Sequence, residues 1–224
     1  KNNVSGTTTI LDAGSGFGQY SYYLAKQSSQ WQISGIDIKQ EQIDDCNKFF
    51  TKINRSEQVN FEYADLTKYI KEDTYNLILS VDVMEHIEDD IKVFENFYSS
   101  LKKNGTLLIS TPSDMGGSDV HEEHEHSFID EHVRDGYNIN DIKEKLEKIG
   151  FKTVSARYSY GKPGKISWKL SMKYPIQLLN ISKLFFIILP FYYLITFPVF
   201  FILNHIDTKN EHIEGTGLIV KAKK

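Results

Sequence analysis

The stretch that decides the fold is Leu11-Asp12-Ala13-Gly14-Ser15-Gly16-Phe17-Gly18. It ends an apolar, β-branched run over residues 7–12 and precedes aromatic and leucine side chains at helical spacing, which predicts a strand, a tight turn and a helix. Glycines in such a turn let the backbone approach a ligand closely, where the first N–H groups of the helix are unpaired. A dinucleotide fingerprint needs its third glycine at position 19, and Gln19 therefore disfavours a nicotinamide reductase.

Strand-like and helix-like segments alternate along most of the chain. Further strands are predicted at residues 31–38, 59–65, 75–82, 106–111, 151–160 and 216–222. Apolar residues at steps of three and four predict helices that include Ile43, Ile87 and Ile139, the second of them running from near Ile87 to Asn104 and Gly105. This alternation predicts an α/β fold with a mainly parallel sheet, whose ligands bind beyond the carboxyl ends of the strands.

Composition limits the class of protein. The chain has 224 residues, of which 40% are apolar and 25% charged, enough for one α/β domain with an elaboration. A single cysteine, Cys46, excludes an internal disulfide framework, so a reducing cytoplasm is the simplest compartment. No signal or transit sequence is visible, and we expect a native N-terminal segment to be missing from this sequence.

Charge is distributed unevenly along the chain. Residues 1–151 carry 15 basic and 27 acidic residues, whereas residues 152–206 carry seven basic residues and no acidic one. A nucleic-acid partner requires Lys and Arg clustered over the binding face, so the acidic body argues against one.

Acidic residues follow the glycine turn at the predicted strand ends. Asp37 ends the second strand, 23 residues after Gly14, where a carboxylate can accept both hydroxyls of a ribose. Asp65 ends the third strand, and Ser80-Val81-Asp82-Val83-Met84-Glu85-His86-Ile87 ends the fourth. In this order and on these strand ends, the features resemble the class I S-adenosylmethionine-dependent methyltransferases over about residues 7–160.

The resemblance implies a Rossmann-like seven-stranded sheet, mostly parallel with an antiparallel last strand, and helices on both faces. It implies S-adenosylmethionine as cofactor and S-adenosylhomocysteine as product. Asp65 would bind the adenine amino group, and Asp12 would orient the turn and the cofactor's amino group, directly or through water. The cofactor-binding residues are expected to be Asp12, Gly14, Ser15, Gly16, Gly18, Asp37, Ile38, Asp65, Leu66 and Val81.

The catalytic residues are less determined. The segment Asp82 to His86 and the later His121-Glu122-Glu123-His124-Glu125-His126 are placed similarly to a metal-binding Glu-x-x-Glu-His segment and a later histidine in the ubiquinone-pathway O-methyltransferases. Asp82 replaces the first glutamate, so a divalent metal stays an alternative. In a metal-free reading His86 or His126 is the general base. A third reading has Glu85 and His86 capping the helix that starts near Ile87, and residues 121–126 forming a polar loop.

An apolar insert separates the last two predicted strands. Ile176–Leu203 contains 21 apolar residues in 28, and Leu184–Ile206 contains no Lys, Arg, Asp or Glu. About 20 such residues suffice for a membrane crossing, but the last strand must return to the same end of the sheet. Pro190 and Pro198 predict short apolar helices centred near Ile187 and Ile195. We therefore expect a helical hairpin that lies on a membrane or dips partly into it.

Basic and aromatic residues accompany this insert, as suits an anionic membrane surface. They are Arg157, Lys162, Lys165, Lys169, Lys173 and Lys183, with Trp168, Tyr174, Tyr192 and Tyr193. A dimer interface or a lid over an apolar soluble acceptor is the alternative. The expected organisation is a methyltransferase core at residues 1–160, the insert at 161–212 and the final strand at 213–224.

The function expected from these features is methyl transfer to an oxygen or nitrogen of a lipophilic or lipid-linked acceptor. The protein would be cytoplasmic and peripheral on the inner face of the cell membrane. Because a sulfonium methyl group is already activated, alignment and exclusion of water would be the protein's main tasks. One alternative is a soluble sugar or secondary metabolite as acceptor, with the insert as lid. Another is a non-catalytic cofactor-binding module that docks a partner.

Overall fold

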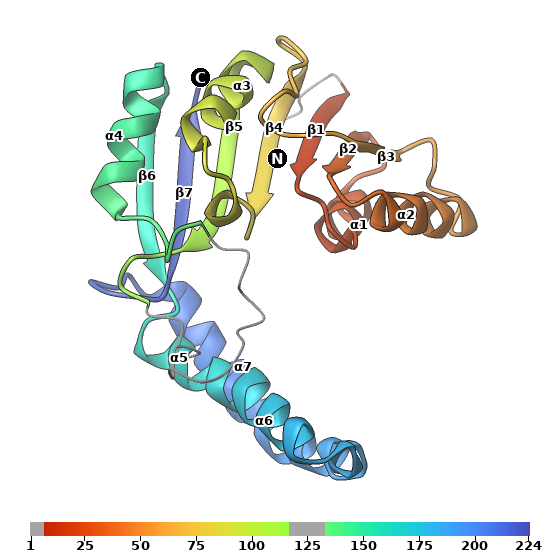
Figure 1. Ribbon diagram of the computed structural model, residues 1–224, viewed down its shortest axis with the longest axis vertical. Coiled ribbons are helices and arrows are strands. Elements are labelled where there is room, and N and C mark those ends of the chain that lie inside the picture. The colour runs from red at the N-terminus through yellow and green to blue at the C-terminus, as the bar shows by residue number, and fades with distance from the viewer. Residues whose placement is uncertain (1–6, 117–132) are drawn as a thin grey trace.

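A seven-stranded sheet forms the centre of the computed structural model, which describes residues 7–116 and 133–224 (Figure 1). The strand order is β3-β2-β1-β4-β5-β7-β6. The strands are β1 (Thr8–Ala13), β2 (Trp31–Asp37), β3 (Val59–Tyr63), β4 (Tyr75–Val81), β5 (Leu101–Pro112), β6 (Lys152–Ser159) and β7 (Gly217–Lys223). Only β7 runs antiparallel to its neighbours, β5 and β6, within the described residues. The predicted Rossmann-like methyltransferase sheet is thereby confirmed.

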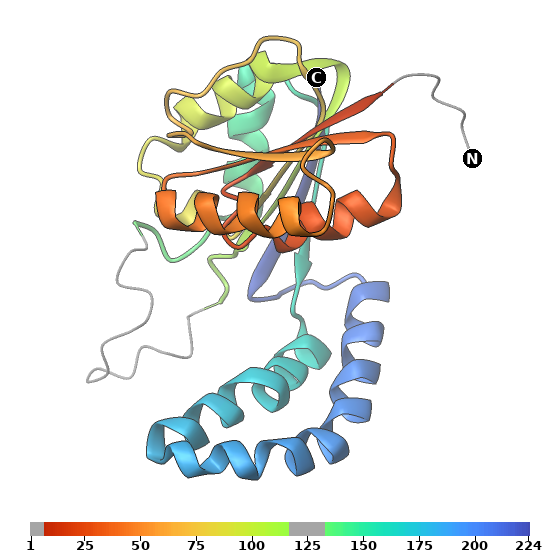
Figure 2. The same ribbon diagram turned by 90° about the vertical axis from the view of Figure 1, so that its right-hand side faces the viewer.

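Helices cover both faces of the sheet (Figure 2). The helices α1 (Gln19–Gln27) and α2 (Gln40–Lys52) lie on one face, and α3 (Asp90–Ser100) and α4 (Ile139–Ile149) lie on the other. Successive side chains of β1 point alternately to the two faces of the sheet, because side-chain direction in a strand repeats every two residues. Ile10 packs in the cluster that contains Phe50 of α2, and Leu11 packs in the cluster that contains Phe94 of α3.

The third helix is shorter than the sequence predicts. Helix α3 begins at Asp90, and the side chain of Asp89 caps it by accepting a hydrogen bond from the backbone N–H of Lys92 at 3.1 Å. It ends at Ser100, so the predicted extension to Asn104 and Gly105 is wrong. The apolar stripe predicted too long a helix because its last member, Leu101, is buried for another reason. Leu101 is the first residue of β5 and pairs with Tyr75.

A helical hairpin joins β6 to β7 and projects from the carboxyl ends of the parallel strands (Figures 1 and 2). Its first arm comprises α5 (Lys162–Trp168), the π-helical turn η2 (Lys169–Lys173), α6 (Tyr174–Ile181) and the 3₁₀ turn η3 (Lys183–Ile187). Its second arm is α7 (Leu189–Lys209), which by length and composition could cross a membrane.

Of the two predicted proline breaks, the one at Pro190 agrees with the start of α7 after the separate turn η3, and the one at Pro198 is wrong. Pro190 lies in the first turn of α7, where a missing N–H costs nothing, and Pro198 lies inside the continuous helix. The first arm holds α7 on both sides of Pro198. The Ser167 hydroxyl donates to the Phe200 carbonyl at 3.0 Å, and the Tyr193 hydroxyl donates to the Ser171 carbonyl at 3.0 Å.

Candidate active site

A cleft of about 880 Å³ lies at the carboxyl ends of β1 to β4. Its walls come from the segments that follow these strands. They are residues 14–20 without Gly18, residues 36–39 with Gln42, residues 63–67, and residues 81–89 without Met84 and Glu85. Ligands of open α/β sheets bind beyond these strand ends, so the cleft is the candidate site.

The glycine turn gives the cleft its close-approach surface. The backbone N–H groups of Gly14 and Ser15 both donate to the Ile36 carbonyl at 2.9 Å, which ties the turn to β2. A Cβ atom on Gly14, whose φ is +79°, would lie 2.3 Å from Val83 Cγ2. A Cβ on Gly16, whose φ is +50°, would meet no atom of the described residues within 4 Å. The absent side chain of Gly16 therefore leaves room for a ligand against the backbone.

Ser15 adds a polar group to this turn. Its Oγ atom is buried and has no hydrogen-bond partner among the described residues. A buried hydroxyl without a partner is costly, so a ligand group that bonded it would be stabilised. Ser15 lines the cleft.

Asp37 connects the turn to the end of β2. Its carboxylate accepts a hydrogen bond from the Gly16 N–H on Oδ2 at 2.9 Å and one from the Lys39 N–H on Oδ1 at 3.0 Å. The neighbouring Ile38 side chain is exposed and also lines the cleft. A fixed carboxylate thus stands beside an apolar side chain at this strand end.

Asp65 repeats this arrangement after β3. Its Oδ1 atom accepts hydrogen bonds from the hydroxyl and the backbone N–H of Thr67 at 2.7 and 2.9 Å, and these bonds lower the pKa of the carboxyl group. Leu66 beside it is buried, and Val81 lines the cleft from the end of β4. Of the predicted cofactor residues, those that line the cleft are Gly14, Ser15, Gly16, Asp37, Ile38, Asp65, Leu66 and Val81.

Asp12 and Gly18 lie behind the cleft wall. The buried Asp12 carboxylate accepts hydrogen bonds from the hydroxyl and N–H of Ser21 at 2.6 and 3.0 Å, which fixes the first turn of α1. Burial raises the pKa of Asp12 to about 6. A Cβ on Gly18 would lie 3.0 Å from the Phe61 ring, so this glycine permits close packing of α1. Contact between Asp12 and a cofactor stays a prediction.

His86 and Asp82 line the end of the cleft next to β4, whereas Glu85 does not. Burial raises the pKa of Asp82, an effect that His86 opposes. Glu85 is buried and accepts a hydrogen bond from the Thr111 hydroxyl at 3.0 Å, so it is committed to the sheet. The described residues contain no group of three or more His, Cys, Asp or Glu side chains suited to a metal.

Two interpretations of the sequence around these histidines have different outcomes: one concerns residues outside the described part of the chain, and the other is wrong. His121, His124 and His126 lie outside the described residues, so the predicted role of His126 stays a prediction. The capping role considered for Glu85 and His86 is wrong, since both belong to the 3₁₀ turn η1 (Met84–His86) and Asp89 caps α3.

Two tyrosines that were not predicted from the sequence interact electrostatically with Asp82, which lines this end of the cleft. Tyr20, in the first turn of α1, lines the cleft, and burial, then the charge of Asp82 and then Tyr160 raise its pKa. Tyr160 directly follows β6, and burial and Asp82 raise its pKa as well. Tyr20, Asp82 and Tyr160 are therefore close enough for their charges to influence one another. For Tyr20 a signal existed in the sequence, because the glycine turn places the next helical residues, Gln19 and Tyr20, at the cleft.

The sheet order, with its antiparallel β7, and the cleft at the strand ends define the Rossmann-like methyltransferase fold class. The family model described as "Methyltransferase domain" matches residues 5–162, and the chain belongs to this family.

Several relatives are named methyltransferases. The chain is 33% identical over 151 residues to phosphoethanolamine N-methyltransferase 1 of Triticum aestivum, covering 66% of this chain and 29% of that protein. It is 29% identical over 102 residues to malonyl-[acyl-carrier protein] O-methyltransferase 1 of Ilyobacter polytropus, covering 46% and 37%. The chain thus spans about a third of the length of these relatives.

Solved structures share the fold. Phosphoethanolamine N-methyltransferase 2 of Haemonchus contortus, crystallised with S-adenosyl-L-methionine, superimposes with a TM-score of 0.68 at 18% identity. The alignment covers 100% of this chain and 50% of that one.

Proposed function

We propose that the protein is an S-adenosylmethionine-dependent methyltransferase that acts on an oxygen or nitrogen of a lipophilic or lipid-linked acceptor. The observation that carries the proposal is that the cleft, with its strand-end carboxylates, opens at the same edge of the sheet from which the exposed apolar hairpin projects.

The residues of the cleft fit the parts of this cofactor. Asp37 can accept the ribose hydroxyls, and Asp65 can accept from the adenine amino group with Ile38 and Leu66 against the ring. The open side of Gly16 and the unpartnered Ser15 hydroxyl suit the methionine part. The bound cofactor supplies a methyl group activated by the sulfonium charge, so the chain's own work is to align the acceptor and exclude water.

The group that accepts the proton of the acceptor lies at the end of the cleft next to β4 in this proposal. His86 lines this end, and an imidazole can take a proton from a hydroxyl or an ammonium group near neutral pH. The relatives include enzymes named for N-methylation and for O-methylation, which supports either atom as the acceptor.

The hairpin supports a lipophilic acceptor. Tyr160 directly precedes the hairpin, and burial and then the charge of Asp82, which lines the cleft, raise the pKa of Tyr160, so the hairpin root is close enough to this end of the cleft to interact with it electrostatically. Since the hairpin is basic as well as apolar, we place the protein in the cytoplasm, peripheral on the anionic inner face of the cell membrane.

Two measurements test this function. Calorimetry should show S-adenosylhomocysteine binding to the wild-type chain and much weaker binding to Asp37→Ala. Cells that express the wild-type chain, fed methyl-labelled methionine, should accumulate label in the lipid extract, whereas cells that express His86→Ala should not. Absence of binding by a folded chain would refute the cofactor assignment. Label that enters only water-soluble small molecules would refute the lipophilic acceptor.

A further inference from the structure

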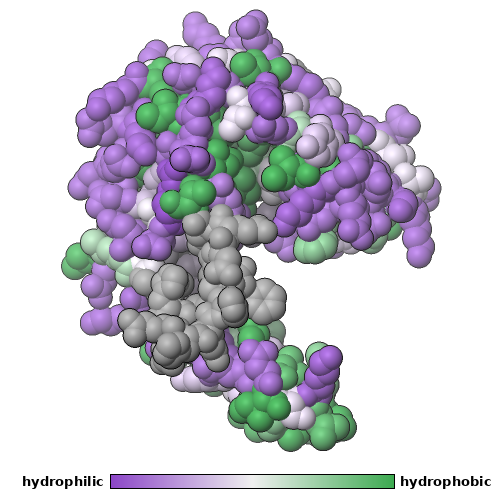
Figure 3. Space-filling model, viewed as in Figure 1, coloured by the Kyte–Doolittle hydropathy of each residue, from purple (hydrophilic) through white to green (hydrophobic). Residues whose placement is uncertain are grey.

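The hairpin carries an apolar surface that extends around the second arm. Phe197 and Val199, which point about 160° apart on a helix, are 54% and 48% exposed, Leu194 and Ile195 are 77% and 75% exposed, and Phe191 near the distal end is 67% exposed. Only 6% of the most apolar window of α7 is buried. Figure 3 shows hydrophobic residues gathered at this distal end, whereas the sheet domain is mostly hydrophilic.

The surface is unlike one that pairs with a second protein chain. An interface between proteins covers one side of a helix, and the opposite side stays polar. Here apolar residues on nearly opposite sides of the helix, Phe197 and Val199, are both exposed. A second copy of this chain would also bring its own basic hairpin, since residues 152–206 contain seven basic residues and no acidic one.

Charge changes along the first arm. Its root and middle carry Lys162, Lys165, Lys169 and Lys173, whereas the distal part of the hairpin, residues 174–195, carries Lys183 as its single charged residue. A lysine ammonium can reach the headgroups because its stem is apolar, and the free-energy cost of placing this charge in a bilayer rises with depth. Lys183 therefore favours shallow entry of the distal part into a bilayer.

Tyrosines join the two arms between the basic and the apolar parts. The Tyr192 hydroxyl donates to the Leu170 carbonyl at 2.7 Å, and the Tyr193 hydroxyl donates to the Ser171 carbonyl at 3.0 Å. Tyrosine is enriched where an apolar phase meets water, because its ring is apolar and its hydroxyl polar. This level of the hairpin suits the bilayer interface.

The root of the hairpin fixes it to the sheet. The buried Asp207 carboxylate accepts hydrogen bonds from the N–H groups of Tyr160 and Gly164, each at 3.0 Å, and pairs with His212 at 3.0 Å. A Cβ on Gly164 would lie 2.8 Å from this carboxylate. The first and last residues of the hairpin are thus held together beside the ends of β6 and β7.

We infer that the hairpin is a monotopic anchor that enters one leaflet of an anionic bilayer with residues 174–195 and does not cross it. Both arms leave from one edge of the sheet, so both must lie on one side of the membrane. The basic residues of the first arm then contact the anionic headgroups, where each contributes a several-fold gain in affinity. The anchor deepens the proposed function by naming the surface at which the cleft works, yet it does not depend on the reaction.

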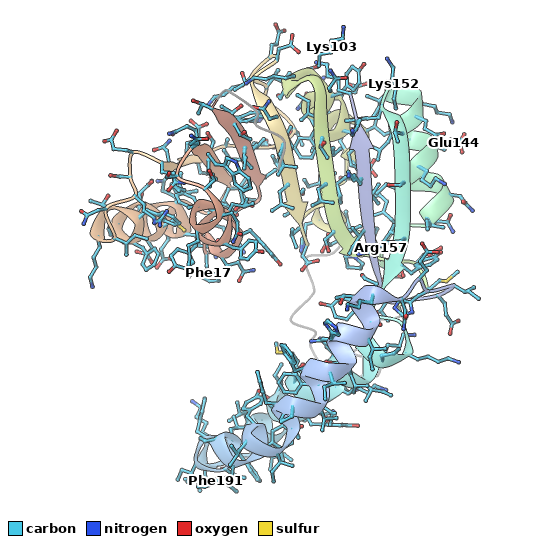
Figure 4. All side chains as sticks on the ribbon, turned by 180° about the vertical axis from the view of Figure 1, so that it is seen from behind. Phe17, Lys103, Glu144, Lys152, Arg157 and Phe191 are labelled. Atoms are coloured by element: carbon cyan, nitrogen blue, oxygen red, sulfur yellow. The ribbon has the colours of Figure 1, made fainter. Side chains whose placement is uncertain are left out.

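Vesicle sedimentation tests the anchor. The wild-type chain should bind vesicles of phosphatidylcholine with 30% phosphatidylglycerol and bind pure phosphatidylcholine at least tenfold more weakly. Lys162→Glu with Lys165→Glu should weaken anionic binding by about 25-fold or more. Leu194→Glu with Ile195→Glu, at exposed positions, should abolish it. Lys103→Glu with Lys152→Glu makes the same charge change at the opposite end of the sheet (Figure 4) and should preserve most of the binding.

Depth is measured separately. In a variant with Trp31→Phe and Trp168→Phe, Phe191→Trp places one fluorophore at the distal end of the hairpin (Figure 4). Its fluorescence should be quenched more by lipids brominated near the headgroup than by lipids brominated near the chain end. Ile187→Cys should resist a membrane-impermeant maleimide that is enclosed inside the vesicles.

Three results would overturn the anchor. They are equal binding to neutral and anionic vesicles, labelling of the Ile187→Cys variant from the vesicle interior, and a wild-type chain that forms a dimer without detergent and does not bind vesicles. None of these readouts involves the cofactor. Failure of S-adenosylhomocysteine binding would therefore refute the proposed reaction without touching the anchor.

Discussion

Asp12→Asn should change how the stability of the fold depends on pH. The Asp12 carboxyl group is buried beneath the glycine turn, and burial raises its pKa from 3.8 to about 6. The folded chain therefore binds a proton more tightly than the unfolded chain, so stability falls as pH rises through the interval from about 4 to about 6. A shift of about two units corresponds to about 3 kcal/mol, all of it absent from a variant that carries no charge at this position.

Urea denaturation at several pH values between 4 and 7.5 measures this effect. The free energy of unfolding of Asp12→Asn minus that of wild type should rise by about 2.5 kcal/mol over this range, because about 0.5 kcal/mol of the total is already lost at pH 4, just above the unfolded pKa. The amide oxygen can still accept from Ser21, so the variant should fold. Ser21→Ala is the matched control. It keeps the charge and removes a bond that lowers the pKa, so its pH dependence should persist with a higher midpoint. A difference that stays constant with pH would refute the reasoning.

Three further predictions concern the cleft. Gly14→Ala forces a Cβ to 2.3 Å from Val83 and should lower the free energy of unfolding by about 1–3 kcal/mol in urea denaturation. Gly16→Ala, whose Cβ meets no atom of the described residues within 4 Å, should lower it less. It should still abolish S-adenosylhomocysteine binding in calorimetry. Asp37→Ala removes the acceptor of the Gly16 N–H and the expected ribose contact, and should weaken that binding by about tenfold to a hundredfold. His86→Ala should lower methyl transfer by about a hundredfold or more and leave S-adenosylhomocysteine affinity within about twofold; equal losses of both would contradict its role as a base.

The core of the fold could be predicted because its signals are local. Apolar periodicity and the glycine turn locate every strand of the sheet, and acidic residues at strand ends locate most of the cleft lining. These predictions do not depend on the details of side-chain packing, because parallel strands always bring their carboxyl ends to one edge of the sheet. Asp12 and Gly18 are the predicted cofactor residues that do not line the cleft, and Asp12 shows why. Its position before the turn does not say whether its side chain faces the ligand or the core.

Other features depend on tertiary contacts that no local pattern contains. Glu85 fits a metal-binding spacing, yet it turns toward Thr111 because the 3₁₀ turn η1 orients it into the sheet. Leu101 continues a helical stripe, yet its backbone pairs with β4. Pro198 signals a break, yet contacts with the first arm hold α7 continuous. In each case a neighbour distant in sequence decides between two locally acceptable conformations.

The uneven charge of the chain bears on how the cleft would meet its acceptor. With the proposed anchor, an anionic leaflet would repel the acidic body and attract the basic hairpin. Both effects would turn the hairpin toward the membrane and hold the sheet domain away from it. Because the Asp207 carboxylate accepts a hydrogen bond from the Tyr160 N–H, the hairpin root is fixed to the end of β6, and that orientation would carry over to the sheet domain. In the proposed arrangement these contacts would therefore set the height of the cleft above the lipid, and with it the length of acceptor that could reach His86.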